Sequence, residues 1–453
     1  MSVPPVVPLL DEGLGNSSYV VDLGEGRALV VDASVDLRSV RTATGRAGLK
    51  VAYAGDTHLH ADFLSGARQL ATTDGATVLA SAAGDRQFAH TGLVDGQEVD
   101  LGGLRLTALV TPGHTTEHVS FLLSDGERPL GVFTGGSLLV GAAARTDLGD
   151  PDRTVELARA QYRSLRRLMS LPDDVEVWPT HGAGSFCSAP PGAERTSTIG
   201  RERATNPLLQ AGSEDEFAQR LLGSLGTFPA YFLRLPEINR LGPRLYDAAP
   251  IPPALSVSQV EALRDSGAQV IDVRPVPDYA AGHLTGAVSI PLRGAFATWL
   301  GWVVSPDRPV VIVRGADQDP AEIAWQAAKV GYDNLVGELT SLPEEWVAAG
   351  LPVSAIALLQ PEDLEGRPVL DVRQLSEFAS GHLPDATHVE LGDLAERAAR
   401  WRGTPVVVMC GHGERAMTGA SLLEAAGAGN VAVMARGPRD WADNTGVPLE
   451  LGR

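Results

Sequence analysis

Residues 405–416 read Pro-Val-Val-Val-Met-Cys-Gly-His-Gly-Glu-Arg-Ala. The run begins with β-branched apolar residues, which are typical of a strand buried on both faces. The small residues from Met417 onward favour a helix that ends at Gly427. Cys410 therefore follows a buried strand and precedes a helix, where loop N–H groups and the helix N-terminus stabilise an anion.

The loop around this cysteine has the composition of a reactive thiol site. Arg415 adds a fixed positive charge, and Cys410 is predicted to form a thiolate that can carry a second sulfur atom as a persulfide. The loop residues predicted to contact an anionic substrate are Gly411, His412, Gly413, Glu414 and Ala416. The alternative is a small buried apolar cysteine. The reactive interpretation requires a sulfur that faces N–H donors and is reachable from solvent.

This loop resembles the active-site loop of rhodanese sulfurtransferases. Cys410 to Arg415 spans six residues, the length found in sulfur-transferring members of that family. The resemblance continues upstream through Val369–Arg373, Glu377-Phe378 and Gly381–Leu383, which match the family's first strand and its following turn. It implies an active rhodanese domain over residues 358–453, with Cys410 as the nucleophile and Arg415 as its charged partner.

A second copy of the pattern lies upstream. Asp272–Arg274 and Gly282–Leu284 repeat Asp371–Arg373 and Gly381–Leu383 at one fixed spacing, which indicates a duplicated unit. The alignment places Arg314 where Cys410 stands. This copy, over residues 254–352, is expected to keep the fold, to lack sulfur chemistry and to serve as a scaffold or interface. His283 and His382 occupy matching turns and are predicted to be fold residues.

The N-terminal half carries candidate metal ligands in four short motifs. In chain order these are Thr57-His58-Leu59-His60-Ala61-Asp62, Thr111-Pro112-Gly113-His114-Thr115, Thr134-Gly135-Gly136 and Pro179-Thr180-His181-Gly182. Histidines at alternate positions leaving a strand project to one side and can bind a single ion, and a nearby aspartate can reach the same ion. The candidate ligands are His58, His60, His114, Asp62 and His181.

These motifs resemble the metallo-β-lactamase superfamily over residues 8–205. Within it the persulfide dioxygenase branch is the closer match, carried by Ala61-Asp62, Arg145–Leu148 and His181–Ser185. Bacterial persulfide dioxygenase–rhodanese fusions have the same domain order. The resemblance implies an αββα sandwich, one bound iron, and oxidation of low-molecular-weight persulfides in sulfide detoxification. It also suggests that Arg145 orients substrate, although an internal ion pair with Asp147 is the alternative.

Two positions depart from that branch. Phe63 follows Asp62 where the family has a histidine, and Gly136 stands where the family has the carboxylate that binds iron beside His58 and His114. Two histidines and a carboxylate are the donor set of non-haem iron oxygenases, so the family's iron site is not intact. Three arrangements remain open: zinc on His58, His60 and His114, iron with Asp62 as the new carboxylate, or no metal.

Length and composition predict a multidomain α/β protein. The 453 residues suggest about three domains at roughly 150 residues each. The proline-rich stretch 247–254 marks a linker, so the predicted domains are 1–246, 254–352 and 358–453. The N-terminal domain is the expected αββα sandwich. In both rhodanese-like domains strand and helix patterns alternate, which predicts parallel sheets covered by helices.

Charge and cysteine content exclude several classes of function. A net charge of −19, spread along the chain, argues against nucleic acid and anionic membranes as partners. No glycine-rich motif opens a βαβ unit, so no nucleotide cofactor is expected. Two cysteines and an N-terminus without a leader pattern predict a protein of the reducing cytoplasm.

The leading hypothesis is a sulfur-handling enzyme of the rhodanese type. Cys410 would take a sulfane sulfur from a low-molecular-weight persulfide or thiosulfate and pass it to an acceptor thiol. Alternatives are a persulfide dioxygenase with one iron, a zinc-dependent thioester hydrolase, and a non-catalytic sulfur carrier or sensor. Cys187, near His181, is either a sulfur relay or a buried loop residue. Fusions of this kind commonly assemble, so a homo-oligomer is compatible with the resemblance.

Overall fold

The computed structural model describes residues 6–187, 194–364 and 366–452. Two compact units divide the chain. Met1–Ala248 with Ala328–Gly331 form the first unit, and Ala249–Ala327 with Tyr332–Arg453 form the second. The three predicted domain ranges stay predictions. Residues 1–5, which belong to the stretch without a leader pattern, lie outside the described residues.

Two six-stranded sheets form the centre of the first unit. In spatial order the first contains β1 (Val6–Asp11), β2 (Asn16–Gly24), β3 (Arg27–Val31), β4 (Lys50–Gly55), β5 (Thr77–Ser81) and β6 (Thr91–Leu93). The second contains β12 (Ser197–Thr198), β11 (Glu176–Pro179), β10 (Arg128–Gly135), β9 (Val119–Asp125), β8 (Leu104–Val110) and β7 (Glu98–Asp100). Strands β3 to β6 pair in parallel, whereas β7 to β10 are antiparallel neighbours.

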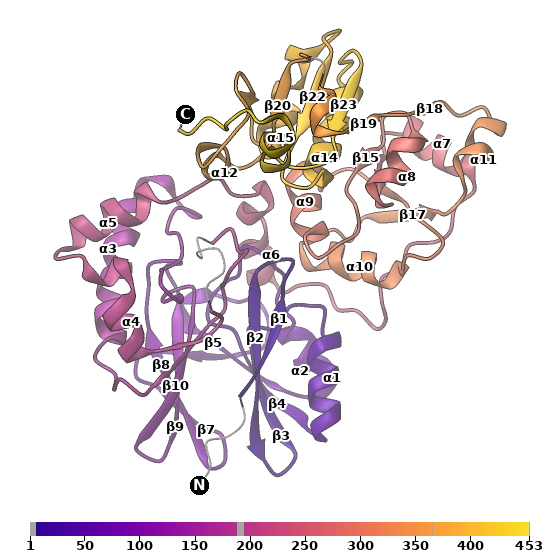
Figure 1. The fold of residues 1–453 in the computed structure, drawn as a ribbon. Helices are drawn as coiled ribbons and strands as arrows, with labels where there is room; N and C mark the ends of the chain where they lie inside the picture. Colours follow the sequence, from indigo (N-terminus) through magenta and orange to yellow (C-terminus); the bar gives the residue numbers. More distant parts are fainter. Residues whose placement is uncertain (1–5, 188–193, 365, 453) are drawn as a thin grey trace. The chain divides into compact units, whose positions relative to one another are not determined.

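The two sheets pack face to face between helices (Figure 1). Tyr19 and Leu29 from one sheet meet Phe121 and Phe133 from the other in a shared apolar core. Helices α1 (Arg38–Ala47) and α2 (Ala67–Asp74) cover the outer face of the first sheet, and α3 (Thr154–Leu168) and α5 (Glu214–Gly223) cover that of the second. Two further helices are α4 (Ile199–Thr205) and α6 (Leu235–Leu241). This layering is the predicted αββα sandwich, which buries both faces of each sheet.

The second unit contains two parallel sheets, as predicted. The first copy has the strand order β15 (Val288–Ser289), β13 (Gln269–Asp272), β16 (Val310–Val313), β17 (Leu335–Leu339), with helices α7 (Val257–Asp265), α8 (Val276–Ala281), α9 (Phe296–Val303), α10 (Pro320–Lys329) and α11 (Pro343–Ala348). The second has β19 (Ala357–Leu359), β23 (Val431–Met434), β22 (Val406–Met409), β20 (Val369–Asp371), β21 (Thr387–His388), with α12 (Leu375–Ala379), α13 (Leu391–Arg397), α14 (Glu414–Ala425) and α15 (Pro438–Thr445). A small antiparallel pair joins β14 (His283–Leu284) to β18 (Val353–Ser354).

The same buried ion pair supports both copies. Arg274 pairs with Asp272 at 2.6 Å and donates to the carbonyl oxygen of Gly282 at 2.8 Å. Arg373 makes the corresponding two contacts in the second copy, at the same distances. A duplicated motif therefore has duplicated geometry, which agrees with a repeated unit.

The matching histidines are fold residues, as predicted. The ring of His283 stacks on Tyr279 with centroids 3.8 Å apart, and its Nδ1 contacts the carbonyl oxygen of the same tyrosine at 2.9 Å. His382 stacks on Phe378 at 3.7 Å and contacts its carbonyl oxygen at 3.0 Å. Both histidines close the turn that follows a short helix.

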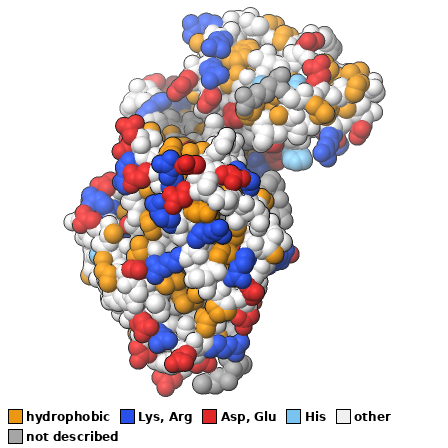
Figure 2. All heavy atoms as spheres, turned by 90° about the vertical axis from the view of Figure 1, so that its left-hand side faces the viewer, with side chains coloured by type: hydrophobic (Ala, Val, Ile, Leu, Met, Phe, Trp, Pro, Cys, Tyr) orange, Lys and Arg blue, Asp and Glu red, His pale blue; other side chains and the backbone are white. Residues whose placement is uncertain are grey.

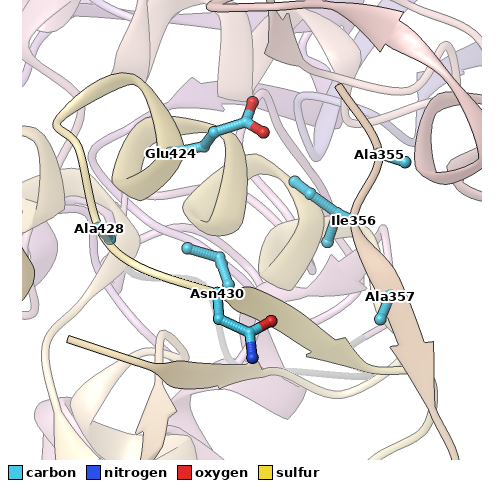
Figure 3. A pocket seen from close by; sticks show the side chains of 7 residues that line it. Ala355, Ile356, Ala357, Glu424, Ala428 and Asn430 are labelled. Atoms are coloured by element: carbon cyan, nitrogen blue, oxygen red, sulfur yellow. The ribbon is translucent and has the colours of Figure 1, made fainter. Parts of the chain in front are cut away.

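The two copies contact each other through defined side chains. The Nε2 of His283 lies 2.9 Å from a carboxylate oxygen of Glu424 on α14. Glu424 also lines a hollow of about 480 Å³ together with Ile356 and Asn430 (Figure 3). Trp302 of α9 packs over Gly392 of α13, where a side chain would meet the indole ring.

The surface agrees with a dispersed charge. On the face of the first unit seen in Figure 2, acidic and basic side chains are intermingled. Among the described residues, no helix combines the length and the apolar composition needed to cross a bilayer. The cytoplasmic location stays a prediction.

Packing at Gly392 gives a test of the contact between the copies. A Cβ at this position would lie 1.7 Å from Nε1 of Trp302, so Gly392→Ala forces α9 and α13 apart. We expect the variant to lose about 1–3 kcal/mol of stability, the usual cost of overpacking. Urea denaturation followed by tryptophan fluorescence measures this loss. Gly149→Ala is the control, because nothing lies within 4 Å of that added methyl group.

Candidate functional site

Histidines that follow different strands gather in the first unit. His58 comes after β4, His114 after β8 and His181 after β11, and each is at most 2% exposed. Ring centroids lie 4.9 Å apart for His58 and His114, and 5.3 Å apart for each of these with His181. One ring nitrogen from each lies within 4.8 Å of the others. The structure thus brings together three of the predicted ligands.

The other two predicted ligands lie beside this group. Nε2 of His60 lies 3.2 Å from Asp32, and its ring stacks on Phe63 with centroids 4.1 Å apart. Asp62 lies 3.2 Å from Nδ1 of His181. Asp62 therefore contacts one histidine of the group, His181, whereas His60 contacts the carboxylate of Asp32.

Burial and mutual contact control the charges in this cluster. Burial and the neighbouring imidazoles hold the pKa of His58 well below its usual value, and the same causes lower that of His114 to about 3. Burial alone would lower the pKa of His181, but Cys187 and Asp62 raise it well above its usual value. Burial alone would raise the pKa of Asp62, but His181 lowers it to about 2. The cluster therefore contains neutral imidazoles at His58 and His114, beside the charged pair formed by His181 and Asp62.

The ring of His114 occupies the space that a side chain at position 136 would need. A Cβ built on Gly136 would lie 2.2 Å from Cδ2 of His114. A donor set of two histidines and the aspartate of the iron family therefore does not fit this arrangement. Three imidazoles are a donor set that binds zinc and other first-row transition metals.

A cavity of about 440 Å³ reaches the cluster through His114. Its wall includes Leu59 and Leu157 as well as Glu117, Arg153 and Arg240. A small molecule with an apolar part and charged groups matches such a lining.

Arg145 is occupied by internal contacts. Its guanidinium makes two hydrogen bonds to Asp147, at 2.7 and 2.8 Å, and donates to the carbonyl oxygen of Phe186 at 3.1 Å. It also lies 4.3 Å from the ring centroid of Phe228, and the residue is 1% exposed. The geometry agrees with the alternative of an internal ion pair, and the substrate-orienting role stays a prediction.

In the second unit, Cys410 lies at the end of the buried strand β22, beside the N-terminus of α14. The N–H of Gly413 donates to its Sγ at 3.1 Å. Gly413 has φ of 98°, a conformation that favours glycine and that turns this N–H toward the sulfur. Cys410 is 1% exposed, so the second condition of the reactive interpretation, a sulfur that is reachable from solvent, is not met in this conformation. A substrate reaches the sulfur only when neighbouring groups move.

Glu377 holds the arginine of the loop. Its two carboxylate oxygens accept hydrogen bonds from Arg415 at 2.6 and 2.8 Å, and the guanidinium lies 6.0 Å from the ring centroid of Trp299. Burial alone would lower the pKa of Arg415, but Glu377 and Cys410 raise it. The positive charge near the sulfur is therefore permanent.

The remaining loop residues border a polar hollow. Gly411 and His412 line a cavity of about 520 Å³ together with Gln360, Ala435, Arg436 and Asp440. Glu414 and Ala416 lie in the first turn of α14. Their roles in substrate binding stay predictions.

The corresponding loop of the first copy is closed by its own side chains. Arg314 makes two hydrogen bonds to Glu338, at 2.9 and 2.7 Å, and donates to the carbonyl oxygens of Gly315 and Gln318. Arg314 thus occupies the place where the second copy carries its thiol, and Glu338 balances its charge.

Comparison with known proteins identifies both kinds of domain. The model of the metallo-beta-lactamase superfamily matches residues 11–181, and that of the rhodanese-like domain matches residues 256–349 and 354–444. The chain joins a metallo-beta-lactamase domain to two rhodanese-like domains. A metallo-beta-lactamase structure from Staphylococcus aureus subsp. aureus COL, 27% identical with a TM-score of 0.66, covers 75% of this chain and 99% of its own.

Relatives of the metallo-beta-lactamase domain include enzymes with different names. Human mitochondrial persulfide dioxygenase ETHE1 is 30% identical over 39% of this chain, which spans 63% of that protein. Hydroxyacylglutathione hydrolase from Methylococcus capsulatus is 31% identical over 39% of the chain, which spans 64% of that enzyme. The chain therefore matches just under two thirds of either protein. The fold and these relatives together imply a metal ion, iron or zinc.

Sequence reasoning missed the groups that hold the site residues in place. Asn16 and Thr57 contact His181 and His58 at 3.0 and 2.9 Å. Glu377 belongs to a motif that sequence matching found, but nothing local to it indicates its pairing with Arg415.

The Arg415–Glu377 pair predicts a pH dependence of stability. Burial would raise the pKa of Glu377, but the hydrogen bonds from Arg415 lower it. A lowered folded-state pKa gives stability that is complete above the unfolded value, about 4.3, and that is lost as pH falls through the folded value. We expect the stability difference between wild type and Glu377→Gln to be constant from pH 6 to 8 and to shrink below about pH 4. Urea denaturation across this range measures it, and a difference that grows toward acid pH would contradict the pairing.

Proposed function

We propose that the second rhodanese-like domain is a sulfurtransferase that carries sulfur on Cys410. The supporting observation is the hydrogen bond from Gly413 N–H to Sγ of Cys410 at 3.1 Å, at the N-terminus of α14. This donor and the helix dipole stabilise a negative charge on sulfur. The domain thus combines a nucleophile with a built-in anion site.

The reaction has two displacement steps. The thiolate of Cys410 attacks the outer sulfur of the donor, a new S–S bond forms, and the donor leaves as a thiolate or, from thiosulfate, as sulfite. An acceptor thiolate then attacks the outer sulfur of the Cys410 persulfide and leaves with it, which regenerates the Cys410 thiolate. Each step is a thiol exchange in which a negative charge moves between sulfur atoms.

Arg415 stabilises this charge in both steps. Its guanidinium is fixed by two hydrogen bonds to Glu377, so little reorganisation is needed when the charge moves. Burial at 1% exposure protects the persulfide between the steps. Access to the sulfur is therefore expected to limit the rate.

We propose a low-molecular-weight persulfide as the donor. The metallo-beta-lactamase domain has relatives named persulfide dioxygenase, and its cavity of about 440 Å³ is of a size that a small thiol fits. A persulfide bound in one domain and sulfur carried on the other would make a single sulfur-handling protein. Thiosulfate is the alternative donor.

A zinc-dependent thioester hydrolase is the second candidate for the metallo-beta-lactamase domain. It is favoured by the group of His58, His114 and His181, since three histidines with an open position suit a zinc-bound water. Relatives named hydroxyacylglutathione hydrolase point the same way.

Replacement of the nucleophile tests the sulfurtransferase. Cys410→Ser is expected to reduce transfer from thiosulfate or glutathione persulfide to background, because no persulfide can form on the hydroxyl. Thiocyanate formation with cyanide as acceptor measures transfer, and intact mass spectrometry detects the added sulfur atom. Cys187→Ser is the matched control and should keep full transfer. Full activity in Cys410→Ser would refute the proposal.

Removal of a single histidine tests the hydrolase. If the cluster supports thioester hydrolysis, His114→Ala should abolish turnover of S-lactoylglutathione while transfer through Cys410 remains. Free thiol release measures the hydrolysis. Oxygen uptake with a persulfide and ferrous iron, without thioester turnover, would favour a dioxygenase instead.

A further inference from the structure

We propose that His58, His114 and His181 form a three-imidazole metal centre of the zinc type. His181 would then take the place of the carboxylate that the related iron sites use. The nitrogen that each ring can offer to a metal is the one without a proton, and the hydrogen-bond partner of each Nδ1 determines which nitrogen that is.

The proton of His114 is on Nδ1. This nitrogen lies 2.7 Å from the carbonyl oxygen of Arg145, and a carbonyl oxygen only accepts hydrogen bonds. In a neutral ring the lone pair is then on Nε2. That atom is buried and has no hydrogen-bond partner among the described residues, which is costly unless an ion or a water binds it.

The proton of His181 is also on Nδ1. The amide nitrogen of Asn16 donates to Asp62 at 2.8 Å, so the amide oxygen of Asn16 faces His181, 3.0 Å from its Nδ1. The carboxylate of Asp62 is a second acceptor, 3.2 Å from the same nitrogen. A carboxylate behind a ligating histidine is the usual support in zinc sites, since it orients the ring and raises its basicity.

The hydroxyl of Thr57 gives His58 the same tautomer, with the proton on Nδ1. Nδ1 of His58 lies 2.9 Å from Oγ1 of Thr57, which lies 2.7 Å from Asp32. The single hydroxyl proton goes to the carboxylate, so the hydroxyl oxygen accepts from Nδ1 of His58. The lone pair of this ring is on Nε2 as well.

Two of the lone pairs face each other at the spacing of metal ligands, and a nitrogen of His114 lies within 4.8 Å of both rings' ligand atoms. Nε2 of His58 and Nε2 of His181 are 3.4 Å apart. Two donors at 2.0–2.1 Å from a tetrahedral ion are about 3.3–3.4 Å from each other. If both rings are neutral, the two lone pairs face each other and repel, and either a proton or a metal ion between them removes the repulsion.

The ring of His114 stands where a side chain at position 136 would be, with Cδ2 only 2.2 Å from the added Cβ. His60 contacts Asp32 through Nε2, so it supports the chain of hydrogen bonds behind His58. Its ring packs 4.2 Å from that of His58 and its Nδ1 has no hydrogen-bond partner among the described residues, but the ring nitrogens that come together in one group are those of His58, His114 and His181. The cavity beside His114 leaves a fourth position open to a small molecule.

This centre does not rest on sulfur transfer at Cys410. Its tests measure bound metal, so they can fail or succeed whatever the rhodanese-like domain does.

Zinc titration of the metal-stripped full-length protein tests the ligand set. We expect one zinc per chain in the wild type. His181→Ala should weaken binding by more than about 100-fold, because loss of an outer supporting group alone costs about 10- to 100-fold. His60→Ala is the matched control, a buried neighbouring histidine whose loss, as that of an outer supporting group, should cost no more than about 10- to 100-fold. The reverse order of the two variants would overturn the proposal in favour of His60 as a ligand, and no zinc bound at one equivalent would overturn it in favour of a proton shared between His58 and His181.

Two further measurements keep the test decisive if a histidine variant does not fold. Cobalt bound to the wild type should give the intense visible absorption of a four-coordinate site, and the weak absorption of a six-coordinate site would overturn the zinc type. Gly136→Ala leaves every ligand intact but places a methyl group against His114. It should weaken zinc binding at least about tenfold, and unchanged affinity would show that His114 is not a ligand in this position.

Discussion

Buried polar groups must find partners, and this requirement determines both candidate sites. In the metallo-beta-lactamase domain Asn16 and Asp62 satisfy one side of His181, so its other nitrogen is directed toward His58. In the second rhodanese-like domain Glu377 satisfies Arg415, so the guanidinium stays beside the sulfur of Cys410. In each case a residue without a chemical role of its own selects the orientation of one that has such a role.

The sequence was sufficient for features that are encoded locally. Four buried residues followed by Cys410 and a helix predict the strand, the loop and the anion site together, and the structure has them in that order. The αββα layers and the parallel sheets were predicted from the resemblances and the alternating patterns. The duplicated Asp-Val-Arg and Gly-His-Leu motifs also gave the correct role for His283 and His382.

Pairings between distant residues could not be predicted in this way. The ring of His60 lies closer to His58 than that of His181 does, yet it is His181 that joins the group of nitrogens with His58 and His114. This depends on the stacking of His60 on Phe63 and on its contact with Asp32, which directly follows β3. The spacing of histidines in the sequence gives no reason to prefer His181 to His60 as a ligand. The exposure of Cys410 could not be predicted either, because the loop pattern that predicts a reactive thiol does not show that this residue is only 1% exposed.

The position of Gly136 bears on how such a protein evolves. The ring of His114 fills the volume that an aspartate side chain at this position would need, with Cδ2 2.2 Å from the position of its Cβ. A carboxylate introduced by this one substitution would meet a neighbour already in its place. A carboxylate ligand could therefore arise here only together with a change that moves His114, which makes a single mutational step to such a site unfavourable.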